Sequence, residues 1–191
     1  MITEVACKHA LKEWAVTIKA LDEGKQVLLM RKGGIREKQF KVEHEEFFLY
    51  PTYEHQRSDL LKDEFHRDLV ETMGSWGGPD EKEISFTHWV QVTNVYEIME
   101  PKKIEALSSH YIWTPDYIEK RLYWRPKMPL EVMLVRAYRL PTAHTLEISP
   151  YFLGCKSWVD MDEPLPLGEL TPVLSDDEYR EMAERVVRAI S

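Results

Sequence analysis

The pattern of apolar and polar residues is most informative over residues 25–56. Residues 27–30 form a near-continuous apolar run, which is typical of a strand buried on both faces. Residues 47–50 form a second, aromatic-rich run that ends at Pro51. The basic turn Arg31-Lys32-Gly33-Gly34 follows the first run directly. We therefore expect two buried strands with a glycine loop and a set of cations at one end.

Apolar residues recur at helical spacing in several other stretches that carry capping signals. Thr3 and Ser58 precede two of them, and Gly24 follows the first, where a C′ glycine is expected. Ser175 and Glu178 form a capping box before the last. The predicted helices cover residues 3–22, 58–74, 101–107, 114–124 and 175–190.

Alternating patterns and β-branched runs predict the strands. In the longest, Ile84, Phe86, His88 and Val90 are expected to share one face, with His88 a satisfied core histidine. Residues 39–43 fit either a half-buried strand or a lead-in to the next one. The predicted strands cover residues 27–31, 46–50, 84–98, 130–140, 145–149 and 155–161. This order predicts an α+β single domain with a mixed, mostly antiparallel sheet, flanking helices and a C-terminal helix.

The length of 191 residues suits one sizeable core, so we expect a single domain over 1–191. No run approaches the roughly 20 apolar residues that span a bilayer, and the first residues lack the apolar region of a signal peptide. Cys7 and Cys155 suggest no disulfide framework and no zinc-ligand spacing. We expect a reduced cytoplasmic protein without a membrane partner; the oligomeric state stays open.

Charge changes this picture because it is unevenly distributed. The net charge of −8 argues against general binding to nucleic acid or anionic membrane. However, residues 25–41 carry six lysines and arginines against Glu37 alone, and residues 117–139 carry six against Glu119 and Glu131. A locally basic face on an acidic body is therefore expected.

The turn Arg31-Lys32-Gly33-Gly34 is the first candidate for chemistry. Glycines let backbone N–H groups converge on an anion, and the flanking cations add charge, which together suit a phosphate. The turn lacks the longer glycine motifs of nucleotide-binding proteins. A plain hairpin with glycine at positive φ is the alternative interpretation.

The second candidate is residues 111–127, where aromatic residues alternate with cations. Aromatic faces stack on bases while cations bind phosphates, as in single-stranded nucleic-acid binding. The alternative is an amphipathic helix with aromatic core residues and solvated cations. The residues expected to line the approach to a phosphate are Lys120, Arg121, Trp124 and Arg125.

Histidines and carboxylates are the third candidate. Divalent cations or zinc could use such groups, which gather in the sequence as Glu43, His44, Glu45 and Glu46, close to Glu54 and His55. Glu43, Glu45 or Glu46, with Lys32 or Lys41, would suit a metal-dependent nuclease or phosphodiesterase. No spacing with built-in metal geometry is present, so no metal ligand or cofactor is predicted, and a solvated acidic strand edge is the alternative. Cys155 lies beside Lys156 and is expected to be a half-buried structural cysteine rather than a nucleophile.

Several segments together resemble a known family. HALKEW, RKGGI, FFLYPTYEHQ, HYIW, MLVRAYRL and GCKSWV are spread over nearly the whole chain, with RKGGI and YPTYEHQ the most specific. They resemble an uncharacterised prokaryotic family, domain of unknown function 1802. The resemblance implies a small stand-alone bacterial or archaeal protein, and it carries over no activity, cofactor or catalytic residue.

The leading hypothesis is a binding domain whose basic face recognises nucleic acid or a nucleotide. It requires that folding bring the two basic segments to a common rim. A metal-dependent nuclease is the rival, so whether the protein is an enzyme stays open. A third hypothesis is a protein-interaction subunit, with Trp76 and the acidic helices as its contact surface.

Overall fold

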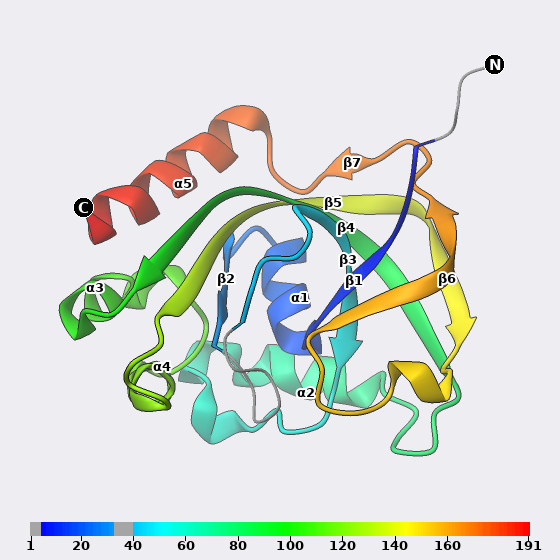
Figure 1. Cartoon of the computed structure of the whole chain (residues 1–191), viewed down its shortest axis with the longest axis horizontal. Coiled ribbons are helices and arrows are strands. Elements are labelled where there is room, and N and C mark those ends of the chain that lie inside the picture. The colour runs from blue at the N-terminus through cyan, green and yellow to red at the C-terminus, as the bar shows by residue number, and fades with distance from the viewer. Residues whose placement is uncertain (1–4, 33–39) are drawn as a thin grey trace.

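A computed structural model describes residues 5–32 and 40–191 of the chain, and Figure 1 shows its arrangement. The proposed cap Thr3 and the Gly33-Gly34 pair lie outside the described residues. Seven strands in the described part form one sheet with the order β2-β5-β4-β3-β1-β6, and β7 pairs with β5. The strands are β1 (Ala6–Trp14), β2 (Leu28–Arg31), β3 (Glu46–Thr52), β4 (Glu83–Ile98), β5 (Leu130–Glu147), β6 (Trp158–Pro166) and β7 (Thr171–Pro172).

The strands pair antiparallel except β1 and β3, which run parallel. The predicted mixed, mostly antiparallel α+β fold with a C-terminal helix is confirmed, whereas the extent 1–191 of the domain stays a prediction. The α-helices are α1 (Ala15–Asp22), α2 (His66–Gly74), α3 (Pro101–Ala106), α4 (Pro115–Tyr123) and α5 (Asp176–Ile190). Short 3₁₀ turns are η1 (Ser58–Leu60), η2 (Asp63–Phe65), η3 (Ser108–His110) and η4 (Pro150–Phe152).

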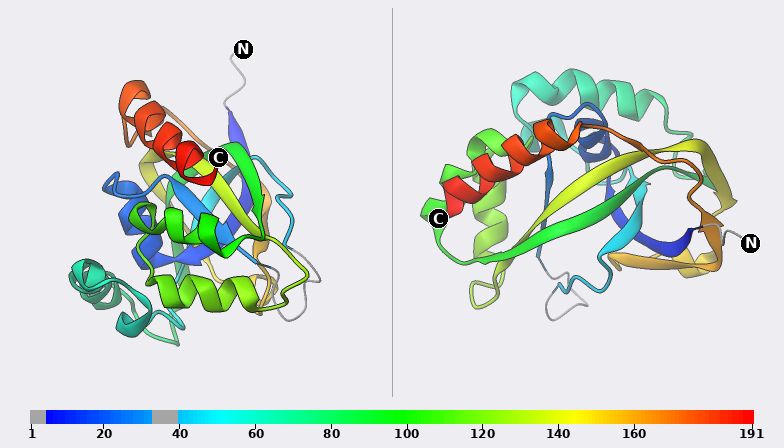
Figure 2. Two further views of the ribbon diagram at one scale, coloured as in Figure 1. Left: turned by 90° about the vertical axis from the view of Figure 1, so that its left-hand side faces the viewer. Right: turned by 90° about the horizontal axis from the view of Figure 1, so that it is seen from above.

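The sheet is strongly curved. In Figure 1, β4 and β5 form an arch with α1 beneath it and α5 above it. Figure 2 shows α3 and α4 side by side at one end of the molecule. The largest core cluster joins these helices to the sheet through Val16, Met30, Ile104, Ile118 and Val186, among others. No helix in the described ranges is both long and apolar enough to cross a membrane.

The predicted helix over 3–22 is wrong in its first half, because residues 6–14 form β1. This strand lies between β3 and β6, and its side chains are buried on both faces, as at Ala10 and Leu11. Burial on both faces removes the alternation of apolar and polar residues by which a strand is recognised, so the spacing of the apolar residues was interpreted as that of a helix. The C′ glycine is confirmed: Gly24 has φ +65 and donates its N–H to the Leu21 carbonyl.

The hairpin alternative for residues 27–50 is also wrong. β2 pairs with β5, and both β5 and β4 lie between β2 and β3. Residues 40–44 form no strand. The predicted strand at 145–149 is largely the end of β5. The strand predicted over 155–161 is β6, which begins only at Trp158 and continues beyond the predicted end to Pro166.

The face assigned to β4 changes partway along the strand. A β-bulge shifts the register between Phe86 and His88. Phe86 and Trp89 therefore belong to one core cluster, and Val90 belongs to another on the opposite face. One extra residue in a strand exchanges the faces of all the residues that follow.

Helix boundaries followed their capping signals unevenly. Thr114 accepts a hydrogen bond from the Tyr117 N–H, and Ser175 and Glu178 form the predicted capping box. Ser58, in contrast, forms no cap: two 3₁₀ turns lie at 58–60 and 63–65, and α2 begins at His66.

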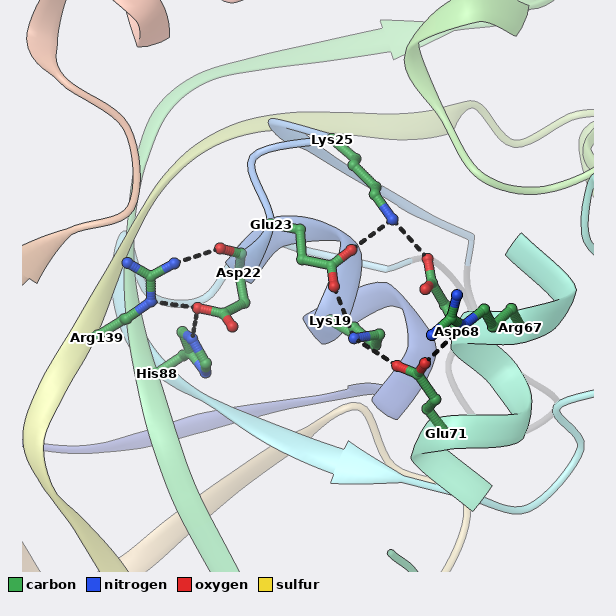
Figure 3. A network of polar contacts seen from close by, with 9 residues as sticks. All are labelled: Lys19, Asp22, Glu23, Lys25, Arg67, Asp68, Glu71, His88 and Arg139. Atoms are coloured by element: carbon green, nitrogen blue, oxygen red, sulfur yellow. Dashed lines mark hydrogen bonds and ion pairs between the residues drawn. The ribbon is translucent and has the colours of Figure 1, made fainter. Parts of the chain in front are cut away.

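Polar contacts join α1 to α2, as Figure 3 shows. The ammonium of Lys19 lies 2.7 Å from a Glu23 carboxylate oxygen and 3.1 Å from one of Glu71. Lys25 pairs with Glu23 and, at 2.9 Å, with Asp68. Exposed pairs of this kind contribute little singly, but a shared network fixes how the helices meet.

A second set of contacts joins α1 to the sheet. Asp22 accepts hydrogen bonds from Arg139 and from Nε2 of His88, the latter at 2.9 Å (Figure 3). Nδ1 of His88 lies 2.8 Å from the Thr87 hydroxyl. His88 is thus the satisfied buried histidine that the sequence predicts.

Candidate functional site

The two basic segments meet at Lys32. This residue directly follows β2, and its ammonium donates a hydrogen bond to the carbonyl oxygen of Leu122 in α4. The side chain is buried, and burial lowers the pKa of Lys32, with the nearby positive charge of Arg121 lowering it further. Residues 25–41 and 117–139 are therefore in contact at this buried point, whereas a common exposed rim of the two segments stays a prediction.

Arg31 is engaged inside the fold. Its guanidinium donates to the Lys12 carbonyl at 3.0 Å and to the Ser157 hydroxyl at 2.8 Å. It also lies 3.5 Å from a carboxylate oxygen of Glu13, which is itself buried. These contacts tie the end of β2 to the end of β1, two strands that are not neighbours in the sheet.

Helix α4 separates its residues into a buried and an exposed side. Thr114 caps it, Pro115 occupies its first turn, and Ile118 and Leu122 enter the core. Lys120 lies on the exposed side. Arg121 is partly buried, with its guanidinium over the Tyr117 ring.

The aromatic residues of 111–127 fall into two groups. Tyr111 and Trp113 are core residues, and Tyr117 stacks on Trp14. For these the packing interpretation is correct. Tyr123 and Trp124, however, are 55% and 52% exposed, which is unusual for adjacent large aromatics.

A left-handed turn follows the helix. Helix α4 ends at Tyr123 with Trp124 as its C-cap residue, and Arg125 has φ +56. Residues other than glycine seldom adopt this conformation. The turn closes with a hydrogen bond from the Met128 N–H to the Arg125 carbonyl. We call the exposed side of α4 and this turn the α4 surface: Lys120, Arg121, Tyr123, Trp124, Arg125 and Lys127.

The lysines of the α4 surface are available to a ligand. Within the described part of the chain, Lys120 and Lys127 form no ion pair at 4 Å or less. Lys120 acts on Asp59 only as a minor cause of its lowered pKa, behind Arg57.

The carboxylates proposed for a nuclease do not assemble into a site. Glu43, Glu45 and Glu46 are all exposed, and Glu46 accepts a hydrogen bond from Gln91. None of the three belongs to a group that could hold a metal ion among the residues that the structure describes. The three carboxylates are solvated, as the alternative interpretation expects, but they do not lie on a sheet edge, because β3 lies between β4 and β1.

Two further candidates from the sequence are Trp76, whose part in an interaction surface stays a prediction, and Cys155. Trp76 is half-buried and stacks on Tyr53, with ring centroids 5.5 Å apart and planes at 4°. Cys155 is exposed, so its expected half-buried position is wrong.

One cluster was found only in part from the sequence: His44 was a candidate ligand, but its partners His9 and Asp160 were missed. His9, His44 and Asp160 each offer a ligand atom within 4.8 Å of the others. Burial, together with the nearby His9, lowers the pKa of His44. The residues come from β1, from the segment before β3 and from β6, so no local spacing in the sequence signals them.

The structure thus defines a mixed α+β domain with a small basic and aromatic surface on α4. The chain matches the model of the family "Domain of unknown function (DUF1802)" over residues 10–185 and belongs to that family, as the resemblance implied. A comparison with curated proteins gave no match.

Solved structures of the ASCH protein from Zymomonas mobilis are similar to this chain. The ASCH structure has 11% identity and a TM-score of 0.39, covering 92% of this chain and 93% of that one. Two single-residue mutants of it have 9% and 12% identity and TM-scores of 0.40 and 0.39, covering 92% of this chain and 96% and 94% of theirs. Because the identities and TM-scores are this low, the function of this chain must be argued from its own residues.

Proposed function

We propose that this protein binds single-stranded nucleic acid through the α4 surface. The observation that carries the proposal is the exposure of the adjacent aromatic side chains Tyr123 and Trp124 among cations. Aromatic faces stack on unpaired bases, and lysine and arginine bind the phosphates between them. A nucleic-acid strand presents bases and phosphates repeatedly at regular spacing, whereas a free nucleotide has only one base.

Charge supports a local rather than a general interface. The chain carries a net charge of −8, but no acidic residue lies between Glu119 and Glu131 in the sequence. Helix α4 also exposes Asp116 and Glu119, so the cationic part of the surface is residues 120–127, and the acidic remainder limits non-specific adsorption.

The residues first predicted to bind phosphate have different parts in this proposal. Lys32 and Arg31 hold α4 and the strand ends in place, because both are engaged within the fold. Lys120, Arg121, Trp124 and Arg125 form the contact surface. The predicted phosphate contact of Gly33 and Gly34 lies outside the described residues and stays a prediction.

Fluorescence anisotropy with labelled single-stranded DNA and RNA at several salt concentrations tests the proposal. If three or four phosphates are contacted, the logarithm of the affinity falls with that of salt with a slope of about −2 to −3. Trp124→Ala is expected to weaken binding by about 1–3 kcal/mol, the usual value for one stacked base. Trp124→Phe, which keeps an aromatic face, restores part of it.

Tyr151→Ala is the matched control. Tyr151 is another exposed aromatic residue with a cation, Lys156, over its ring, but it lies on η4, outside the α4 surface. Its removal should leave the affinity unchanged. The proposal is refuted if neither strand binds, if binding is insensitive to salt, or if Trp124→Ala binds as well as the unaltered protein.

A further inference from the structure

A cluster of two histidines and one aspartate lies apart from the α4 surface. His9 is on β1 and faces Asp160 across the β1–β6 pair, where the two residues are register partners. His44 lies in the segment that precedes β3. Three residues distant in the sequence thus converge at the edge of the sheet formed by β6.

We infer that His9, His44 and Asp160 bind a divalent transition-metal ion, with Zn²⁺ as the favoured ion. The ligand set is nitrogen from each imidazole and oxygen from the carboxylate. Two histidines and a carboxylate are a frequent set for zinc with three protein ligands, in which water occupies the fourth position. This inference is independent of nucleic-acid binding.

The distances suit such an ion. The three donor atoms lie within 4.8 Å of one another. In a tetrahedral site with bonds of about 2.1 Å, ligand atoms are about 3.4 Å apart. The rings of His9 and His44 are already stacked with centroids 3.5 Å apart and planes at 10°. Parallel stacked rings direct their in-plane nitrogen lone pairs side by side rather than at one point, so the His44 ring must rotate about its side-chain torsions for both nitrogens to face one ion.

Neighbouring residues hold the histidines in place. Nδ1 of His9 is 2.7 Å from a carboxylate oxygen of Asp160. An ion bound here takes the place of the proton between these two atoms, so Nδ1 of His9 and a carboxylate oxygen of Asp160 are the ligand atoms. The edge of the His44 ring packs on Trp158, with centroids 5.2 Å apart, and the Trp158 indole N–H donates to the Lys41 carbonyl at 3.0 Å.

The cluster is open enough for an ion to enter. The side chains of His9 and Asp160 are 27% and 47% exposed, and His44 is partly buried. Solvent therefore reaches the fourth coordination position. Lys8 and Glu43 are the outer charges acting on His44, and they shift its pKa in opposite directions.

Isothermal titration of the chelator-treated full chain with Zn²⁺ tests the inference. We expect one ion per chain and a rise in the thermal midpoint on addition of Zn²⁺, since a ligand that binds only the folded state stabilises it. His44→Ala and Asp160→Asn should each weaken binding at least about tenfold, because even the loss of outer partners costs that much. With Co²⁺, the unaltered protein should show visible absorption typical of tetrahedral coordination.

His110→Ala is the control, because His110 is a partly exposed histidine in η3, outside the cluster. It should bind Zn²⁺ like the unaltered protein. His44 lies outside the strands, so His44→Ala keeps the fold, which circular dichroism checks. The inference is overturned if the unaltered protein takes up no stoichiometric Zn²⁺, or if His44→Ala and Asp160→Asn bind it undiminished.

Discussion

The ammonium of Lys32 donates a hydrogen bond to the backbone carbonyl of Leu122, and this bond joins α4 to the end of β2. The two residues are 90 positions apart in the sequence. The contact explains how two basic segments come together although each is otherwise part of a different element. It also means that Lys32 acts mainly by holding the α4 surface in position.

Lys32→Met is therefore expected to reduce stability. The substitution keeps an apolar stem but leaves the Leu122 carbonyl without its donor, which costs about 1–2 kcal/mol of unfolding free energy. Relief of the buried charge keeps the loss at the lower end. Urea denaturation measures it. Lys120→Met is the control. Because Lys120 is exposed, the unfolding free energy of this variant should change by less than about 0.5 kcal/mol, while its affinity for nucleic acid should fall.

Asp22 should make the fold sensitive to acid. Burial tends to raise the pKa of Asp22, but hydrogen bonds from His88 and Arg139 outweigh burial and hold the pKa below its usual value. Folding therefore favours the ionised form, and this stabilisation is present above the unfolded pKa of about 3.9 and lost as the pH falls through the lower folded pKa.

Asp22→Asn tests this effect. At neutral pH the unfolding free energy should fall by about 1–2 kcal/mol, a value reduced because the Asp22 side chain is 35% exposed. Below about pH 4 the difference from the unaltered protein should shrink. Asp80→Asn, at an exposed turn position, should show neither change. Equal stability of Asp22→Asn and the unaltered protein at neutral pH would contradict the argument.

Local signals in the sequence predicted the elements whose stability is local. The capping box of α5 and the Thr114 cap of α4 both depend on residues within a few positions of one another, whereas the alternation predicted for β4 holds only up to the bulge after Phe86. The prediction of a helix at residues 6–14 was wrong for the opposite reason. The burial of β1 on both faces depends on β3, β6 and the packed helices, which are distant in the sequence, so the local pattern does not show it.

The candidate site was predictable only in part. The sequence identified the cations and aromatics of α4, but not that Trp113 would be buried and Trp124 exposed. It also did not reveal that Arg31 would meet Glu13 and Ser157, because that contact depends on strand order. The cluster of His9, His44 and Asp160 is of the same kind, assembled by pairing across the sheet.

Gly24 is expected to resist substitution. It has φ +65, and an added Cβ would lie 2.7 Å from a methyl carbon of Leu174. Gly24→Ala should therefore lower the unfolding free energy by about 1–2 kcal/mol, because alanine is strained in the left-handed conformation. The loss should be larger if Leu174 cannot shift away from the added Cβ. Gly74→Ala is the matched control. Gly74 ends α2 with nothing within 4 Å of an added Cβ, so alanine should be neutral or slightly stabilising there.

Ser175 should contribute more to stability than Ser58, although both precede apolar residues at helical spacing. The Ser175 hydroxyl accepts from the Glu178 N–H at 3.3 Å, and a Glu178 carboxylate oxygen accepts from the Ser175 N–H at 2.9 Å. Ser175→Ala is therefore expected to lower the unfolding free energy by about 1 kcal/mol. Loss of helical signal near the start of α5 should accompany it, because a terminal helix frays when its cap is removed.

Ser58→Ala provides the comparison. Ser58 opens a 3₁₀ turn, and no side-chain cap bond is formed there, so alanine should change stability by less than about 0.5 kcal/mol. Amide hydrogen exchange over residues 176–180 separates a local effect from a global one. Faster exchange confined to this turn in Ser175→Ala supports the cap as its cause, because the first-turn N–H groups lose their acceptor. Equal exchange in both variants would show that Val186 and Ile190, packed in the core, hold α5 without help from its cap.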